Sequence, residues 1–430
     1  MDLALDILSA WGQAALRLLL HPFYYLGIVL ILLQYRRQIQ LERKLFHSRI
    51  HHLASEAWRL VLWGLAAGSG VSLVMAFLGS ALTAEAVLLL WAAAGILMLF
   101  RLRFLCIAYA AGVLGTVKAV LDWVPAGSDY AAAGWLYRWM ERVDAPGLLA
   151  LAGVLHLAEA MLIRYQGSRT ASPLFLESKR GRIMGGFQMY GFWPLAMFLI
   201  VPAAGSGGIG LPWEPLFGAG LVSGGWTVLA VPAVLGFTEQ TWTELPRVKA
   251  RRSSGLLMVY AVAVVGLALA AHWVAPLLIA ASVLTIILHE ALIWISNWQE
   301  AKRQPIYVHE PQGLKILAVL PGSPAAALGL ETGEIIEKVN GMRVRTKEEL
   351  HLALQANPAY CKLELLNLDG QTRFAGRAVF SGDHHQLGIL LCPDDDARYV
   401  VEQRRGRGLL SALFQNLGGL PGKAGSGKSV

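Results

Sequence analysis

The sequence predicts a polytopic α-helical membrane bundle of eight or nine spans, followed by a small water-soluble α+β domain. Of its 430 residues, 55% are hydrophobic and only 15% are charged. Ordinary soluble domains are about 45–50% apolar and about 25% charged. All 14 tryptophans lie between Trp11 and Trp298, and after residue 300 the long apolar runs give way to regularly spaced charges. These observations exclude a soluble enzyme of two ordinary domains and put the boundary near residues 297–305.

Nine apolar segments are candidates for membrane spans, because a spanning helix needs about 20 mostly apolar residues. They cover residues 16–34, 58–79, 84–100, 104–121, 147–164, 187–204, 216–236, 255–271 and 274–296. The first, third, fourth and eighth are short or weakly bounded, so eight spans remain an alternative to nine. We therefore assign residues 1–300 to a transmembrane region in a lipid bilayer.

The basic residues predict how this region is oriented. Loops 35–57, 101–103, 164–186 and 237–254 hold 16 lysines and arginines, whereas the leading segment and loop 122–146 hold three. Cytoplasmic loops are enriched in Lys and Arg. This predicts an outside N-terminus and a cytoplasmic C-terminal domain. The net charge of +8 then follows from topology, so we expect no nucleic-acid partner.

The three cysteines, Cys106, Cys361 and Cys392, are odd in number and far apart in the sequence. They form neither a disulfide framework nor a CxxC metal pair, which fits a reducing compartment. The sequence therefore predicts no cofactor and no metal site.

The C-terminal domain reads as alternating strands and turns with one main helix. A strand at 314–320 ends at a Pro-Gly turn, and a second strand covers 334–339. Asn340-Gly341 is a strong two-residue hairpin signal. Thr346 with Glu349 three residues later has the pattern of a capping box, which opens a helix to about Ala356. Two further strands joined at Asp369-Gly370 and a last strand at 386–390 complete the domain.

This order resembles a bacterial PDZ domain. The residues that carry the resemblance are PGSPAAALGL at 321–330, GEIIEKVNG at 333–341, the helix at 346–356 and LGI at 387–389. PDZ domains bind an extended peptide as an added strand and hold its terminal carboxylate with backbone N–H groups. By resemblance the carboxylate loop is Gln386, Leu387, Gly388 and Ile389. His351 either faces the groove or lies on a solvated helix face. A PDZ fold that binds no peptide is the alternative.

A PDZ domain beside a membrane bundle raises the hypothesis of an intramembrane protease, which the motifs do not support. Zinc chemistry of this kind needs HExxH on a helix. The chain has His289-Glu290, but Ile293 occupies the position where HExxH requires its second histidine. Residues 422–429 match the Walker A pattern, but the stretch is rich in Gly, Lys and Ser with only Val430 after it, so we expect a flexible tail rather than a phosphate-binding helix. We predict no catalytic residues.

His156 and Glu159 share a helix face inside an apolar segment. Ionisable residues within a membrane are costly and by default suggest a function. They form either an interhelical polar pair or part of a proton or substrate path.

The whole chain resembles the MinJ family of Gram-positive rods over residues 16–392. Besides the PDZ motifs, the resemblance is carried by HPFYY at 21–25, QYRR at 34–37 and ERKLF at 42–46. It implies a non-enzymatic membrane scaffold at poles and septum, which links DivIVA-like and MinD-like proteins and places the division site. The domains expected are 1–300 transmembrane, 301–392 PDZ and 393–430 a flexible tail.

Two other functions stay open. One is a PDZ adaptor for secretion, envelope stress or membrane proteolysis, including a site-2-protease-like relative without the zinc motif. The other is an enzyme or transporter that uses His156, Glu159, His289 and Glu290.

Overall fold

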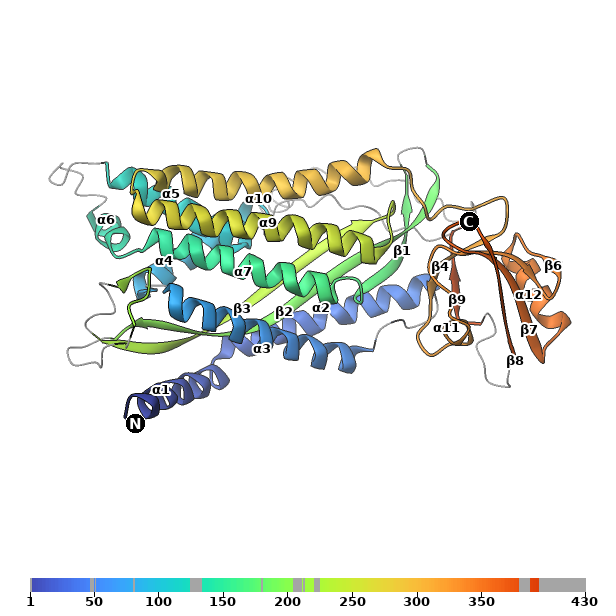
Figure 1. Cartoon of the computed structure of the whole chain (residues 1–430), viewed down its shortest axis with the longest axis horizontal. Helices are drawn as coiled ribbons and strands as arrows, with labels where there is room; N and C mark the ends of the chain where they lie inside the picture. The colour runs from blue at the N-terminus through green and yellow to red at the C-terminus, as the bar shows by residue number, and fades with distance from the viewer. Residues whose placement is uncertain are drawn as a thin grey trace, which may run out of the picture.

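The computed structural model describes residues 2–46, 50, 52–79, 82–123, 134–178, 181–203, 211, 213–219, 225–378 and 387–393. The chain is elongated, with a long helical region at one end and a smaller domain of strands at the other (Figure 1). The tail 394–430 and Gln386 lie outside the described residues.

Four described helices are long and apolar enough to cross a membrane. They are α3 (Leu53–Leu78), α7 (Ala145–Gln166), α9 (Pro246–Trp273) and α10 (Leu277–Lys302). Helices α1 (Asp2–Leu19) and α2 (Pro22–Phe46) are bent by 53° at a short break and add a fifth span if they count as one. Pro22 lacks the N–H that would continue α1 into α2. The described part of the chain thus holds four or five candidate spans, and the expected eight or nine are not confirmed.

Two of the expected helices are strands, and that prediction was wrong. Residues 187–202 of the first segment fall in β2 (Ile183–Pro202), and residues 226–236 of the second segment fall in β3 (Trp226–Thr241). An apolar run buried on both faces shows no period that separates strand from helix. Pro194 and Pro232, each inside its run, could have argued against a helix. Strands β2 and β3 form an antiparallel sheet with β1 (Ala171–Glu177), in the order β1-β2-β3.

Helix α3 packs directly on this sheet. A side-chain carbon added at Gly64 would lie 2.1 Å from the Pro194 carbonyl oxygen, and one at Gly68 would lie 2.4 Å from that of Ala196. Ser72 also links α3 to the sheet, because its hydroxyl oxygen accepts a hydrogen bond of 2.8 Å from the backbone N–H of Phe198. Small residues spaced by four let a neighbour approach closely. Here the neighbour is a strand.

Helices α4 (Ala84–Phe100) and α5 (Ile107–Leu121) are too short to span. At 1.5 Å per residue they are about 26 Å and about 23 Å long, against an apolar layer of about 30 Å. The break between them, with η1 (Leu102–Leu105), lies beside the middle of α10, where Arg103 pairs with Glu290 at 2.9 Å. Arg101 and Arg103 therefore do not belong with the basic loops, although the other loops still favour the same orientation. The short α6 (Gly134–Glu141) precedes α7.

The C-terminal domain has the expected elements in the expected order. They are β4 (Leu314–Val319), α11 (Pro324–Ala327), β5 (Ile335–Val339), β6 (Met342–Arg343), α12 (Lys347–Ala356), β7 (Tyr360–Leu366), β8 (Thr372–Ala378) and β9 (Ile389–Leu391). The sheet order is β8-β7-β5-β4-β9, with β6 paired to β5. Asn340 and Gly341 both have positive φ, as the hairpin requires, and Thr346 and Glu349 form the capping box.

A separate apolar cluster joins the two regions. Tyr307 and Leu390 are buried together with Phe187 from β2. The N–H of Gly185 donates to the Tyr307 carbonyl at 2.7 Å, and the Tyr307 hydroxyl donates to the carbonyl of Glu244 at 3.1 Å. The C-terminal domain therefore packs on the end of the β1-β2 sheet.

Candidate functional site

Strand β9 is one of the two edge strands of the C-terminal sheet, and among the described residues it pairs only with β4. Its inward side chains Ile389 and Leu391 share a core with Leu350 and Ala353 of α12. An edge strand presents unpaired N–H and C=O groups that can pair with another chain. In the part of the domain that the structure describes, the outer edge of β9 therefore has no partner strand, and the side chains of β9 pack against α12.

The turn that leads into β9 has an unusual backbone. Leu387 and Gly388 have φ values of 56° and 76°, both in the left-handed region. The Leu387 carbonyl accepts from Ala325 N–H at 2.9 Å, and the Gly388 carbonyl accepts from Leu320 N–H at 2.9 Å. A side-chain carbon on Gly388 would lie 2.2 Å from the Ser323 Cβ. Glycine is therefore required at this position.

These contacts set the direction of the neighbouring N–H groups. In a trans peptide the N–H of one residue points opposite to the C=O of the residue before it. Since the carbonyls of Leu387 and Gly388 point into the domain, the N–H groups of Gly388 and Ile389 point away from it. N–H groups that point away from the domain are donors that an anion could accept from.

His351 lies on the exposed side of α12, whose buried residues are Leu350 and Ala353. Its Nε2 is 2.9 Å from the Gln355 amide nitrogen, one helical turn away. Its surroundings are those of a solvated helix face.

The structure brings together two of the four ionisable residues that the sequence places inside apolar segments. The rings of His156 on α7 and His289 on α10 lie 5.3 Å apart. Glu290 instead forms an ion pair with Arg103 at 2.9 Å and accepts a hydrogen bond from the Tyr109 hydroxyl at 2.8 Å. No metal-ligating group that includes Glu159 or Glu290 is found among the described residues.

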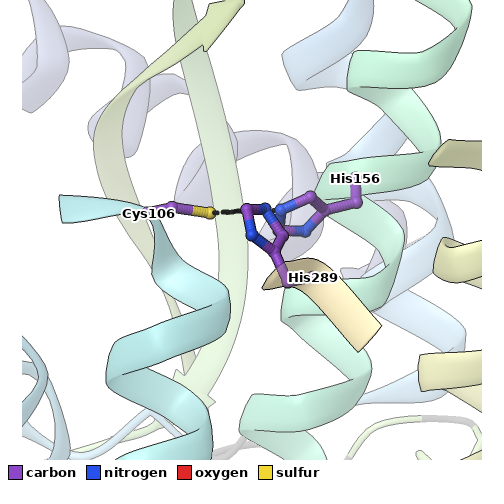
Figure 2. A group of neighbouring side chains, drawn as sticks. All are labelled: Cys106, His156 and His289. Atoms are coloured by element: carbon purple, nitrogen blue, oxygen red, sulfur yellow. Dashed lines mark hydrogen bonds between the residues drawn. The ribbon is translucent and has the colours of Figure 1, made fainter. Parts of the chain in front are cut away.

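Sequence reasoning missed the third partner of the histidines. Cys106, the residue before α5, points its Sγ toward both rings (Figure 2), at 3.2 Å from His156 Nε2 and 3.7 Å from His289 Nε2. In the sequence, Cys106, His156 and His289 stand out only as polar side chains inside or next to apolar runs. That pattern does not tell which polar side chains meet in the fold. Asn367 to Gly370 forms the turn between β7 and β8, as expected.

Comparison with known proteins identifies both regions. A family model described as a PDZ domain matches residues 315–366. The chain is 30% identical over 394 residues to the cell division topological determinant MinJ of Bacillus subtilis, covering 90% of this chain and 96% of that protein. It is 29% identical over 366 residues to a probable cell division topological determinant MinJ of Lacticaseibacillus paracasei, covering 83% of this chain and 91% of that protein. No solved structure matches the chain.

The relatives cover the helical region and the PDZ domain alike, because the match spans nine-tenths of the chain. Their names and the PDZ domain support a role at the division site, and they suggest a role without catalysis. With its apolar helices, this protein is a membrane protein. The chain belongs to the MinJ family of cell division topological determinants.

Proposed function

We propose that the chain is a non-enzymatic membrane scaffold that helps to place the division site, and that its PDZ domain holds partners there. The observation that carries the proposal is the match to MinJ over 90% of the chain, together with a PDZ strand, β9, whose outer edge pairs with no other described strand. By resemblance, the partners are DivIVA-like and MinD-like proteins.

In this proposal a partner's C-terminal segment adds to β9 as a further strand. Its terminal carboxylate accepts hydrogen bonds from the outward N–H groups of Gly388 and Ile389, and Leu387 and Gln386 complete the loop. Main-chain pairing gives affinity and side-chain pockets give specificity. A single contact of this kind has a Kd on the order of micromolar, about −8 kcal/mol. Several copies confined to one membrane would bind more tightly through avidity.

The proposed organisation puts residues 1–300 in the membrane and residues 301–392 in a cytoplasmic PDZ domain, with 393–430 as a flexible tail. The cytoplasmic side is supported by the basic residues near the ends of α2, α7 and α9, which Figure 1 places at the end of the bundle nearer the PDZ domain. We propose that the protein is enriched at poles and septum.

The first experiment images a functional fluorescent fusion at native expression in dividing cells. Enrichment at septa and poles, with filamentous cells after deletion, supports the scaffold. An even membrane distribution with normal division would contradict it and favour an adaptor for secretion, envelope stress or proteolysis.

The second experiment tests the loop with two matched glycine variants. Gly388 and Gly370 both have φ of +76°, so alanine strains both backbones alike. Only at Gly388 does the added carbon meet a neighbour, Ser323, because nothing lies within 4 Å of the position at Gly370. We expect Gly388→Ala to lose capture of partner C-terminal peptides and septal enrichment, and Gly370→Ala to keep both.

Hydrogen exchange of the β5 and β7 amides serves as the folding control for both variants. If Gly388→Ala keeps every partner bound while the domain stays folded, the loop is not the working surface. His351→Ala asks in addition whether α12 contributes: weaker peptide binding would place His351 in the groove, and unchanged binding would leave it on the solvated face.

A further inference from the structure

We propose that Cys106, His156 and His289 together bind one transition-metal ion, zinc(II) or copper(I), inside the membrane region. The three side chains come from the break before α5, from α7 and from α10 (Figure 2). Their ligand atoms lie within 4.8 Å of one another. This site is independent of the PDZ groove and of the proposed scaffold role.

The distances fit a shared ion. In a tetrahedral site with Zn–S of about 2.3 Å and Zn–N of about 2.05 Å, sulfur and nitrogen lie about 3.6 Å apart. The two Sγ to Nε2 distances, 3.2 Å and 3.7 Å, lie on either side of that value. A small movement of His156 would therefore be enough to admit the ion.

Hydrogen bonds to the other ring nitrogens leave both Nε2 atoms as acceptors. Nδ1 of His156 is 2.7 Å from the carbonyl oxygen of Ala152, which can only accept, so Nδ1 carries the proton. Nδ1 of His289 is 3.0 Å from the Tyr109 hydroxyl oxygen. Because that hydroxyl donates its own proton to Glu290 at 2.8 Å, it accepts from His289. Each neutral imidazole therefore points an Nε2 lone pair at Cys106.

A thiol cannot satisfy this arrangement. Cys106 has one proton to donate, whereas two imidazole lone pairs face its sulfur. An unpaired polar group in an apolar environment carries the full cost of its lost hydration. A cation bound to the thiolate uses all three lone pairs at once.

The groups around the cluster resemble the outer shell of metal sites. Histidines that bind metals almost always donate their second N–H to a carbonyl, carboxylate or water, and this fixes the ring orientation. Here Ala152 supplies a carbonyl to His156, and Tyr109 connects His289 to the pair formed by Glu290 and Arg103. The ring of Tyr260 packs edge-on against both histidines, with centroids 5.3 Å and 5.5 Å away.

The outer groups of the site line a cleft at the surface of the bundle. A cleft of about 610 Å³ is lined by Arg103, Tyr109 and Glu290, the residues that hold His289. Cys106 and His289 are half-buried, while His156 is buried. The cleft therefore reaches the outer groups of the site on one side only.

The donor set decides the class of ion. Thiolate and imidazole ligands suit zinc and copper(I), whereas magnesium and calcium require oxygen ligands. Three protein ligands leave a fourth position for water or another ligand. Because the ligands come from three separate segments, the ion would hold the break at 101–106 against α7 and α10.

The test measures metal bound to the purified full-length chain in lipid nanodiscs. The protein is stripped with a chelator, reloaded with Zn²⁺ alone or with Cu⁺ alone under reducing conditions, desalted and analysed by mass spectrometry for metal. We expect about one ion per chain in the wild type. We expect Cys106→Ser to fall to background and Cys361→Ser, which changes a buried cysteine of the PDZ domain, to keep the ion.

Three readouts distinguish loss of ligands from loss of folding. Tryptophan fluorescence checks that Cys106→Ser is folded, since all 14 tryptophans lie in the membrane region. Alkylation of the wild type then reports on the ligand itself: bound metal should protect Cys106 from maleimide, and the chelator should expose it. Cobalt loading should give a thiolate charge-transfer band that His289→Gln lowers.

Equal metal content in the wild type and in Cys106→Ser would overturn the proposal. So would a wild type that binds neither Zn²⁺ nor Cu⁺, because the cluster would then be a thiolate hydrogen-bonded to imidazolium. Maleimide reactivity unchanged by chelator would contradict it as well.

Discussion

The described residues form two antiparallel sheets that differ in how far their strands are exposed. None of the 20 residues of β2 is exposed, whereas exposed and half-buried residues alternate along β8. Helix α3 covers β2 through Gly64 and Gly68. Among the described residues, the PDZ sheet ends in β8 on one side and β9 on the other.

The difference follows from what surrounds each sheet. In a bilayer no water can satisfy backbone groups, so open sheet edges must be buried in protein. In water an edge can stay open and accept a strand. The fully covered β2 fits the first setting, and the half-exposed β8 fits the second.

The two regions should differ most in how much stability is lost when an ion pair near each sheet is broken. Lys249 is buried, with Nζ 3.3 Å from Glu300 Oε1 and 2.9 Å from the Ser296 hydroxyl. Lys249→Ala leaves the Glu300 carboxylate buried without its cation, which typically costs about 3–5 kcal/mol. Denaturant unfolding followed by tryptophan fluorescence measures this loss in the membrane region.

The matched control is Lys338→Ala in the PDZ sheet. Lys338 on β5 pairs with Glu364 on β7 at 2.6 Å, and its side chain is 39% exposed. A pair that stays solvated is worth about 0.2–1 kcal/mol. Hydrogen exchange of the β7 amides reports the change. Equal costs for the two lysine variants would mean that the membrane-side pair is hydrated.

The close packing of α3 on β2 gives the next effect. Gly64→Val places carbon atoms against the Pro194 carbonyl, where the first added carbon already lies at 2.1 Å. Overpacking of this kind typically costs about 1–3 kcal/mol. Gly70→Val on the same helix is the control, because nothing lies within 4 Å of its added carbon. Tryptophan fluorescence would contradict the assigned packing if both variants unfolded at the same denaturant concentration.

A smaller effect is expected where α12 begins. Thr346 accepts the Glu349 N–H at 3.2 Å in the capping box. Thr346→Ala should cost about 1 kcal/mol and speed exchange of the first amides of α12 by about fivefold. Thr372→Ala, on exposed β8, removes a hydroxyl outside the cap and should leave these amides unchanged. Equal exchange in both variants would show that the cap does not hold the helix.

The smallest effect concerns pH. Burial raises the pKa of the Cys361 thiol to about 11. The unfolded chain releases this proton at lower pH than the folded domain does, so the free energy of unfolding falls as pH rises between about 9 and about 11. At pH 9 the loss is below about 0.5 kcal/mol. Hydrogen exchange at pH 7 and pH 9 should show this loss of stability in the wild type and not in Cys361→Ala. An equal loss in both proteins would mean that other groups cause it.

The predictable part of the fold is the part that local signals specify. Asn340-Gly341 and the pair of Thr346 and Glu349 act within a few residues, and the structure has both the turn and the cap. Helices α3, α7, α9 and α10 follow from apolar runs long enough to span. For the proposed carboxylate loop, the structure adds the positive φ of Leu387 and the lack of room for a side chain at Gly388 beside Ser323.

Composition, charge and motif alone determined that this protein has a membrane region followed by a PDZ domain. Only the tertiary structure decided that two apolar runs pair as β2 and β3, because burial on both faces removes the period that separates strand from helix. It also decided that Cys106 meets His156 and His289, which lie 50 and 183 residues away. Contacts between helices leave no fixed spacing along the sequence, so the meeting of these three side chains could not be predicted from it.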